Sequence, residues 1–345
     1  MTTTGEQAPD VATALVESLV PARAAAIQAR GLSKRFDDNV VLRDLSLEVQ
    51  AGEIFGLIGP SGSGKSTAIH LLCGHLRPSG GEMTVLGCEP ARFIPALRRR
   101  IGYMPQGFVL YPDLSVEQNV AFVAGLYGFS EWRNRTRIRT TLELVQLWDA
   151  RKRAAREVSG GMQRRIALAA ALVPDPEVLF LDEPTANLDP ILRAHLWEHF
   201  RALRERGRAI LVTTQYVDEA EYCDRVGLMY DGALIATGQP LSLRRQAFGG
   251  DVVEISIERP ASGYLDALGR VHGVRGTEER GTAPLRVTVE DAQRAIPALL
   301  DALETSGATV RSVAQYQPTF DEVFIRLIEQ HGDPVPPIGR LVTSG

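Results

Sequence analysis

The segment from Gly59 to Ser66 constrains this chain more than any other stretch of its sequence. It reads Gly-Pro-Ser-Gly-Ser-Gly-Lys-Ser and fits the pattern G-x-x-x-x-G-K-[ST]. The apolar run Ile54–Ile58 before it predicts a buried strand, and residues 67–72 after it predict the start of a helix. A glycine-rich loop in that position can direct successive backbone N–H groups around a polyphosphate, at the positive end of the helix dipole. The sequence therefore predicts a phosphate-binding loop within an α/β fold.

Each part of this loop has an expected contribution. The glycines allow the backbone to approach the phosphates closely. Lys65 can reach the β- and γ-phosphate oxygens as a catalytic and binding residue, and the Ser66 hydroxyl can bind Mg²⁺. The nucleotide-binding residues predicted from this segment are Gly59, Pro60, Ser61, Gly62, Ser63, Gly64, Lys65, Ser66 and Thr67.

A second glycine motif lies far downstream, at residues 158–162. Its sequence, Val-Ser-Gly-Gly-Met, runs into a helical stretch from Gln163 to Leu172. Ser159, Gly160 and Gly161 put a hydroxyl and two unhindered amides at a helix N-terminus, which is another way to bind phosphate. An ordinary N-cap followed by a turn would explain this segment taken alone, but not its position among the other motifs.

An apolar run that ends in two acids follows at residues 178–183. Asp182 comes at the end of the predicted strand, where a Mg²⁺-associated carboxylate is expected in a phosphate-binding-loop enzyme. Glu183 comes next and could polarise a water molecule toward a γ-phosphate. Two solvated acids in a loop are the alternative, which the combination of strand, acids and motif order disfavours.

Together these motifs resemble the nucleotide-binding subunit of an ATP-binding cassette (ABC) transporter, over roughly residues 27–240. Residues 59–66 correspond to the Walker A loop, and 178–183 to the Walker B strand with its catalytic acid. Residues 158–162 resemble the signature Leu-Ser-Gly-Gly-Gln, from which Val158 and Met162 depart. The departures leave the phosphate-binding Ser-Gly-Gly intact.

The resemblance assigns three further residues. Gln106 would be the Q-loop glutamine that contacts Mg²⁺ and faces the membrane partner, so Ser66, Gln106 and Asp182 form the implied metal site. Asp189 would belong to the D-loop. Phe36 would stack on the adenine base.

Gln215 stands where most of the family carries the switch histidine. A glutamine keeps a neutral donor and an acceptor but cannot carry a proton charge. With Met162, it makes the chain similar to one branch of bacterial drug-exporter ATPases, the daunorubicin-resistance subunits. The implied catalytic residues are Glu183, Gln215 and Lys65. A degenerate, inactive site is the alternative, against which stands the presence of Lys65, Ser66, Asp182 and Glu183.

The predicted fold class is α/β: a P-loop NTPase with a mainly parallel sheet, an antiparallel β subdomain, a helical subdomain and a small C-terminal α+β domain. The expected divisions are a disordered tail at 1–26, an ABC ATPase domain at 27–245, an accessory domain at 250–330 and a flexible tail at 331–345. The helical subdomain is expected at about 110–156. The accessory domain carries no catalytic constellation, which favours an interface or regulatory role. Residues 318–324 resemble the helix that closes many exporter-type cassettes.

Composition limits the possible partners. The formal net charge of −4 gives no reason to expect nucleic-acid binding. The cysteines, Cys73, Cys88 and Cys223, have neither metal nor redox spacing, which suits a reducing compartment. No apolar run approaches the length that crosses a bilayer, so a separate permease subunit is expected to carry the substrate path.

The resemblance implies an ATP-hydrolysing subunit that uses ATP and Mg²⁺ to power a bacterial exporter of a drug, lipid or polysaccharide type of substrate. It further implies a homodimer, or a heterodimer with a related cassette, on the cytoplasmic face of the inner or plasma membrane. A cytoplasmic helix of the permease would dock near Gln106–Pro112, with Phe108 and Tyr111 as apolar anchors. Two alternatives stay open: a soluble ABC ATPase acting on ribosomes or DNA, and a nucleotide-sensing regulator without significant hydrolysis.

Overall fold

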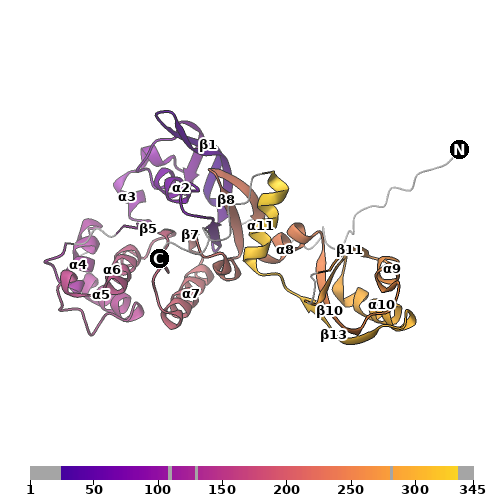
Figure 1. The fold of residues 1–345 in the computed structure, drawn as a ribbon. Helices are drawn as coiled ribbons and strands as arrows, with labels where there is room; N and C mark the ends of the chain where they lie inside the picture. Colours follow the sequence, from indigo (N-terminus) through magenta and orange to yellow (C-terminus); the bar gives the residue numbers. More distant parts are fainter. Residues whose placement is uncertain (1–24, 108–110, 129–130, 280–282, 333–345) are drawn as a thin grey trace.

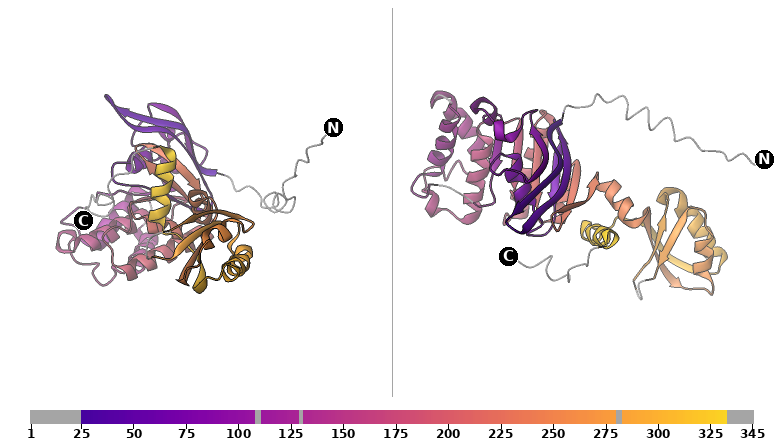
Figure 2. Two further views of the ribbon diagram at one scale, coloured as in Figure 1. Left: turned by 45° about the vertical axis from the view of Figure 1, so that its right-hand side comes forward. Right: turned by 90° about the horizontal axis from the view of Figure 1, so that it is seen from above.

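A computed structural model describes residues 25–107, 111–128, 131–279 and 283–332, with only the backbone described at 131–134. The predicted ATPase domain lies between a helical subdomain on one side and a C-terminal domain on the other (Figure 1). The view from above, on the right of Figure 2, shows the same separation of the three parts. None of the helices in these described ranges is long and apolar enough to cross a membrane.

A six-stranded sheet forms the centre of the ATPase domain, in the order β5-β6-β7-β3-β8-β9. All neighbouring pairs are parallel except β8 and β9, which are antiparallel. The ends of β3, β6 and β7 therefore meet at one edge of the sheet, where ligands of such folds bind. The strands are β3 (Ile54–Ile58), β5 (Ile101–Met104), β6 (Val178–Asp182), β7 (Ala209–Thr214), β8 (Arg225–Tyr230) and β9 (Ala233–Gly238).

Strand β3 shows why the sequence folds this way. All five of its residues are buried, because helices and a second sheet cover both faces of a parallel sheet, and such strands read as unbroken apolar runs. The helices of this domain are α2 (Lys65–Leu72), η1 (Pro90–Arg92), α3 (Pro95–Arg98), α7 (Pro190–Glu205), η3 (Val217–Tyr222) and α8 (Pro240–Phe248).

A three-stranded antiparallel sheet in the order β2-β1-β4 packs on the P-loop helix. It consists of β1 (Ala25–Phe36), β2 (Asn39–Gln50) and β4 (Gly80–Val85). Inward residues of β1 and β2, such as Ile27, Leu45 and Val49, share one buried cluster with α2 and β3. Strand β1 begins at Ala25, inside the tail predicted for residues 1–26.

The helical subdomain contains α4 (Val116–Leu126), α5 (Glu131–Leu144), η2 (Ala155–Glu157) and the start of α6 (Gly160–Leu172). Ser115 and Gln118 form a capping box that fixes where α4 begins. Helix α5 ends at Leu144, so the last part of the helical subdomain predicted at about 110–156 consists of turns and the short η2. Gln146 has a φ of +54°, and a residue in the left-handed region ends a helix.

The C-terminal domain is built on a four-stranded antiparallel sheet, in the order β11-β12-β10-β13. One buried cluster joins this sheet to its two helices, and it contains Val253, Val287, Leu299 and Leu303. The elements are β10 (Asp251–Arg259), α9 (Tyr264–Gly269), β11 (Val274–Glu278), β12 (Leu285–Val289), α10 (Ala292–Thr305) and β13 (Thr309–Tyr316).

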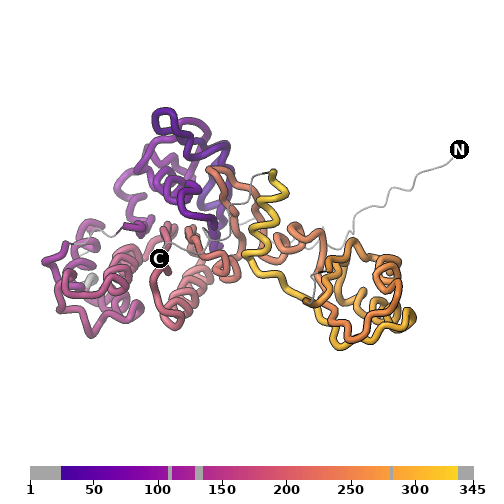
Figure 3. Tube along the Cα trace, in the orientation of Figure 1, coloured from indigo at the N-terminus to yellow at the C-terminus, as the bar shows by residue number. Residues whose placement is uncertain are grey.

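The last helix, α11 (Phe320–His331), lies with the ATPase domain and not on the C-terminal sheet. The chain enters the C-terminal domain after α8 and returns through residues 317–319 (Figure 3). Phe324 and Ile328 are buried in the same cluster as Leu243 and Phe248 of α8. The accessory domain predicted at 250–330 therefore includes a helix that packs elsewhere, and α11 extends through His331, the first residue of the predicted tail.

An arginine joins the C-terminal sheet to α11. Arg286 on β12 pairs with Glu254 on β10 at 2.9 Å and with Glu322 on α11 at 2.8 Å. Its guanidinium lies 3.9 Å from the ring centroid of Tyr316, whose hydroxyl donates to Glu322 at 2.8 Å. Burial alone would lower the pKa of Arg286, but its bonds to Glu322 and Glu254 outweigh burial and raise it. These contacts fix the sheet to the helix that packs on the ATPase domain.

Candidate functional site

The glycine-rich loop connects β3 to α2, and the backbone packs closely around its first and last glycines. A Cβ atom added at Gly59 would meet the carbonyl oxygen of Met229 at 2.2 Å. Gly64 has a φ of +99°, and a Cβ there would meet the Val41 carbonyl at 2.9 Å. Both positions thus require glycine, and α2 begins at Lys65 directly after the second of them.

Two side chains of this loop fit a polyphosphate ligand. Ser63 is buried, and its Oγ has no hydrogen-bond partner among the residues that the structure describes. Such an orphaned polar atom calls for a ligand group. Lys65 is also buried, and its Nζ donates to the carbonyl oxygens of Gly59 and Pro60, both at 2.8 Å. The lysine thus lies against the loop that is predicted to surround the phosphates.

The charge of Lys65 is set by opposing effects. Burial lowers the pKa of its amino group, while Glu183 and Asp182 raise it. These two acids lie at the end of β6 and are buried as well. The loop and the Walker B strand therefore share one partly compensated group of charges, to which a phosphate would add negative charge.

Ser66 and Asp182 lie together at the sheet edge. Ser66 Oγ donates to Asp182 Oδ1 at 3.1 Å, and Thr213 Oγ1 donates to the same oxygen at 2.5 Å. Hydroxyl and carboxylate oxygens are the ligands that Mg²⁺ prefers. Sequence reasoning missed Thr213, although its place beside Gln215 at the end of β7 was a usable signal.

Glu183 is held in an uncommon backbone conformation. Its φ is +50°, which costs a residue with a side chain roughly 1–2 kcal/mol. The Glu183 N–H donates to the carbonyl oxygen of Thr213 at 3.0 Å and to its Oγ1 at 3.1 Å. Gln106 Nε2 donates to the carboxylate of Glu183 at 3.2 Å. A strained residue aimed by such contacts is typical of a functional position.

The structure brings five of the predicted residues together: Lys65, Ser66, Gln106, Asp182 and Glu183. Gln215 follows β7 at the same sheet edge and is half-buried. Phe36 ends β1 with 42% of its surface exposed, and the Lys34 amino group lies 4.7 Å from its ring centroid. An exposed ring at that point is available to a flat ligand.

The signature and D-loop residues stand apart from this group. Ser159 and Gly160 are exposed at the start of α6, where Ser159 Oγ accepts from Met162 N at 3.3 Å. Asp189 is exposed and caps α7 by accepting from Leu192 N at 2.9 Å. Among the described residues, no hydrogen bond joins Ser159, Gly160 or Gly161 to the glycine-rich loop of the same chain.

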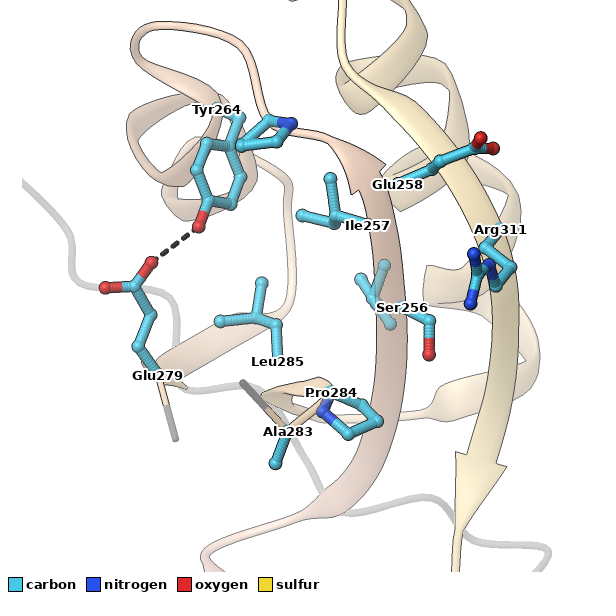
Figure 4. A pocket seen from close by; sticks show the side chains of 11 residues that line it. Ser256, Ile257, Glu258, Tyr264, Glu279, Ala283, Pro284, Leu285 and Arg311 are labelled. Carbon is cyan, nitrogen blue, oxygen red and sulfur yellow. Dashed lines mark hydrogen bonds between the residues drawn. The ribbon is translucent and has the colours of Figure 1, made fainter. Parts of the chain in front are cut away.

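A separate hollow of about 460 Å³ lies in the C-terminal domain. Figure 4 shows its lining, where Tyr264 points toward Glu279 and donates a hydrogen bond to it at 2.5 Å. That bond raises the pKa of Tyr264. Ser256, Glu258 and Arg311 add polar groups to the lining, and none of the predicted nucleotide-binding residues takes part.

The parallel sheet, the glycine-rich loop and the buried acids at its edge define a P-loop nucleoside triphosphatase. The family model described as "ABC transporter" matches residues 42–186, and that of the "ATP-binding protein DrrA1-3-like, C-terminal domain" matches residues 238–328. The chain belongs to the ABC transporter family, and the predicted fold class is confirmed.

Two curated relatives and a solved structure illustrate this membership. The daunorubicin resistance ATP-binding protein DrrA3 of Streptomyces coeruleorubidus is 37% identical, over 88% of this chain and 95% of that protein. The probable multidrug ABC transporter ATP-binding protein YbhF of Escherichia coli K12 is 40% identical, over 68% of this chain but only 40% of its own length. A dimeric post-hydrolysis state of the ATP-binding cassette MJ0796, bound to ADP and Pi, matches with a TM-score of 0.57 and 26% identity, over 62% of this chain and 98% of that one.

Proposed function

We propose that this chain is the ATP-hydrolysing subunit of a bacterial ABC exporter, acting at the cytoplasmic face of the membrane on a separate permease. The observation that carries the proposal is the strained Glu183, held by Thr213 and contacted by Gln106 at the edge where Lys65 lies. The relatives that are named for multidrug transport and daunorubicin resistance support an exporter over a ribosome- or DNA-bound ATPase.

In this proposal each residue at the sheet edge has its own role in hydrolysis. Lys65 and the backbone of residues 59–67 hold the phosphates, and Glu183 takes a proton from the water that attacks the γ-phosphorus. Ser66, Asp182 and Gln106 would hold Mg²⁺, which when bound would offset the negative charge of the β- and γ-phosphates. Phe36 would stack on adenine.

The proposed site is completed by a second cassette. Ser159, Gly160 and Asp189 are exposed and Gly161 is half-buried, so this segment and Asp189 are accessible to another subunit. The N-terminus of α6 would then bind the γ-phosphate of the nucleotide held by the partner's loop. The dimeric state of the MJ0796 cassette supports this arrangement. The partner would be a second copy or a related cassette.

Gln215 is expected to contribute to the chemical step. If its amide contacts the γ-phosphate, Gln215→Ala removes a hydrogen bond to a charged group, worth about 1.5–3 kcal/mol, or one to two decades in kcat. Steady-state ATPase rates and nucleotide titration test this, and ATP affinity should change little. Gln215→His should retain activity, because imidazole offers a similar donor. An unchanged kcat in the alanine variant would exclude Gln215 as the switch residue.

A surface on the helical subdomain is the proposed docking site of the permease. Tyr111 (51% exposed), Phe122 (42%) and Leu126 (69%) form an apolar patch, in which the first two rings lie 4.7 Å apart. Asn119 fixes Tyr111 by accepting from its N–H at 3.0 Å and donating to its carbonyl oxygen at 3.1 Å. The other expected anchor, Phe108, lies outside the described residues.

Charge on this patch should uncouple the subunit from its permease. Tyr111→Asp and Leu126→Asp should each weaken permease binding about thirtyfold, the effect of losing about 2 kcal/mol at an interface hot spot. Co-purification and permease-stimulated ATPase measure the loss, while basal ATPase stays at the wild-type rate. Leu241→Asp is the matched control, because Leu241 is 63% exposed on α8. Full coupling in both patch variants would move the docking surface elsewhere.

A further inference from the structure

One buried carboxylate near the sheet edge has no part in the proposed chemistry. Glu219 lies on η3, the short helix that follows Gln215, and none of its surface is exposed. A carboxylate is costly to bury unless it is paired and hydrogen-bonded. Two other acids on the same helix, Asp218 and Glu221, are exposed, so solvent lies close to Glu219. The burial of Glu219 therefore needs a structural reason.

The first partners of this carboxylate lie on α7. Trp197 Nε1 donates to Glu219 Oε1 at 3.5 Å, and Arg193 Nε lies 3.8 Å from the same oxygen. The Arg193 guanidinium also lies 5.0 Å from the ring centroid of Tyr216, the residue after Gln215. The D-loop residue Asp189 is the N-cap of helix α7, which begins at Pro190. Glu219 thus ties the segment after Gln215 to the helix that the D-loop starts.

Two threonines that flank the predicted catalytic residues interact with the same carboxyl. Burial raises the pKa of Glu219, and Thr185 and Thr214 lower it, followed by Arg193 and Trp197. Thr185 follows Glu183 in the turn after β6, but its hydroxyl and Glu219 Oε2 lie outside full hydrogen-bond geometry.

Thr214 connects Glu219 to the turn that carries Gln215. Its Oγ1 accepts from the N–H of Tyr216 at 3.0 Å, so the bond spans Gln215 and closes the turn that carries it. The N–H of Glu219 donates to the Tyr216 carbonyl oxygen at 3.2 Å, which fixes the same turn from the other side. Thr214 also lowers the pKa of Glu219, so its hydroxyl lies close enough to this carboxylate to interact with it.

We propose that Glu219 is a positioning residue that holds the turn of Gln215 and the turn of Thr185 in one fixed arrangement with α7. It touches neither nucleotide nor water and acts on hydrolysis through Gln215. The inference rests on the proposed role of Gln215 in hydrolysis. Loss of the carboxylate frees the Thr214–Tyr216 turn, so kcat falls while the nucleotide-binding loop, which lies between β3 and α2, keeps its affinity.

The test compares Glu219→Ala and Glu219→Gln with Gln215→Ala and the Gln215→Ala/Glu219→Ala double variant. The kcat of Glu219→Ala should fall about ten- to a hundredfold and that of Glu219→Gln about three- to tenfold, since glutamine keeps one acceptor oxygen. Titration with a fluorescent ATP analogue should give a Kd within about twofold of wild type for each single variant. The conservative variant thus rescues part of the rate.

The double variant separates positioning from general damage. Residues that act as one unit are not additive, so adding Glu219→Ala to Gln215→Ala should cost less than about threefold. Glu221→Ala is the matched control, because Glu221 is an exposed glutamate on the same short helix and should leave kcat within about twofold.

Three results would overturn the inference: wild-type kcat in both Glu219 variants, losses that multiply in the double variant, or a loss of ATP affinity that accompanies the loss of rate. Circular dichroism melting checks the fold of each variant, and Glu219→Gln carries the test if Glu219→Ala does not fold. Wild-type kcat in Gln215→Ala contradicts the proposed role of Gln215. A slow Gln215→Ala variant beside wild-type kcat in both Glu219 variants contradicts only the positioning role.

Discussion

Glu183→Gln is expected to bind ATP as the wild type does and to hydrolyse it about 10²–10⁴-fold more slowly, the usual contribution of a general base. The amide cannot accept the proton of the attacking water. It has nearly the same shape, and the backbone bonds from Glu183 N–H to Thr213 are untouched, so the strained conformation should persist. Steady-state ATPase assays measure the loss, and gel filtration should show accumulation of ATP-bound dimers.

The control for this experiment is Glu221→Gln, which makes the same chemical change on an exposed side chain. It should hydrolyse ATP at the wild-type rate and should not accumulate as a dimer. Wild-type turnover in Glu183→Gln would show that another group takes the proton, and Glu183 would lose its assigned role.

Lys65→Ala is expected to act on binding and not only on the rate. The buried ammonium donates to two carbonyl oxygens of the loop that is proposed to hold the phosphates, and a charge-assisted hydrogen bond is worth about 1.5–3 kcal/mol. Its loss also leaves the carboxylates of Glu183 and Asp182, which raise the pKa of Lys65 against the effect of burial, without their neighbouring cation. The Kd for a fluorescent ATP analogue should therefore rise by roughly ten- to a hundredfold.

Lysine specificity can be tested at the same position. Lys65→Arg should also bind poorly, because a planar guanidinium cannot replace a compact point charge in a buried loop. Lys152→Ala, which removes an exposed lysine, should keep the wild-type Kd. An unchanged Kd in Lys65→Ala would contradict the assigned contact with the phosphates.

The local part of the site was predictable from the sequence, and its long-range part was not. The loop at 59–66 and the acids at 182–183 are each a continuous segment of the chain, so the sequence alone predicts their chemistry. The bond from Gln106 to Glu183 and the buried position of Glu219 depend on tertiary packing. The sequence does not show which distant segments will surround a given polar side chain.

The local parts of the fold were also predictable from the sequence, and its long-range contacts were not. The unbroken apolar run of β3 identified a buried strand, but Val274–Glu278 gave no strand signal, because only Val274 is apolar in this exposed edge strand β11. The apolar face of α11 predicts a buried helix without saying what buries it. Its return to the ATPase domain depends on contacts with Leu243 and Phe248, far from it in the sequence.

This return of α11 has a consequence for how the protein is made. The cluster that contains Ile54 of β3 is closed by Phe324 and Ile328, close to the end of the described chain. The ribosome thus translates the glycine-rich loop, strands β6 and β7 and the whole C-terminal sheet before it makes α11, the helix that covers this core. The core stays uncovered until α11 has been made, so the apolar face of α8 is open to other chains until then.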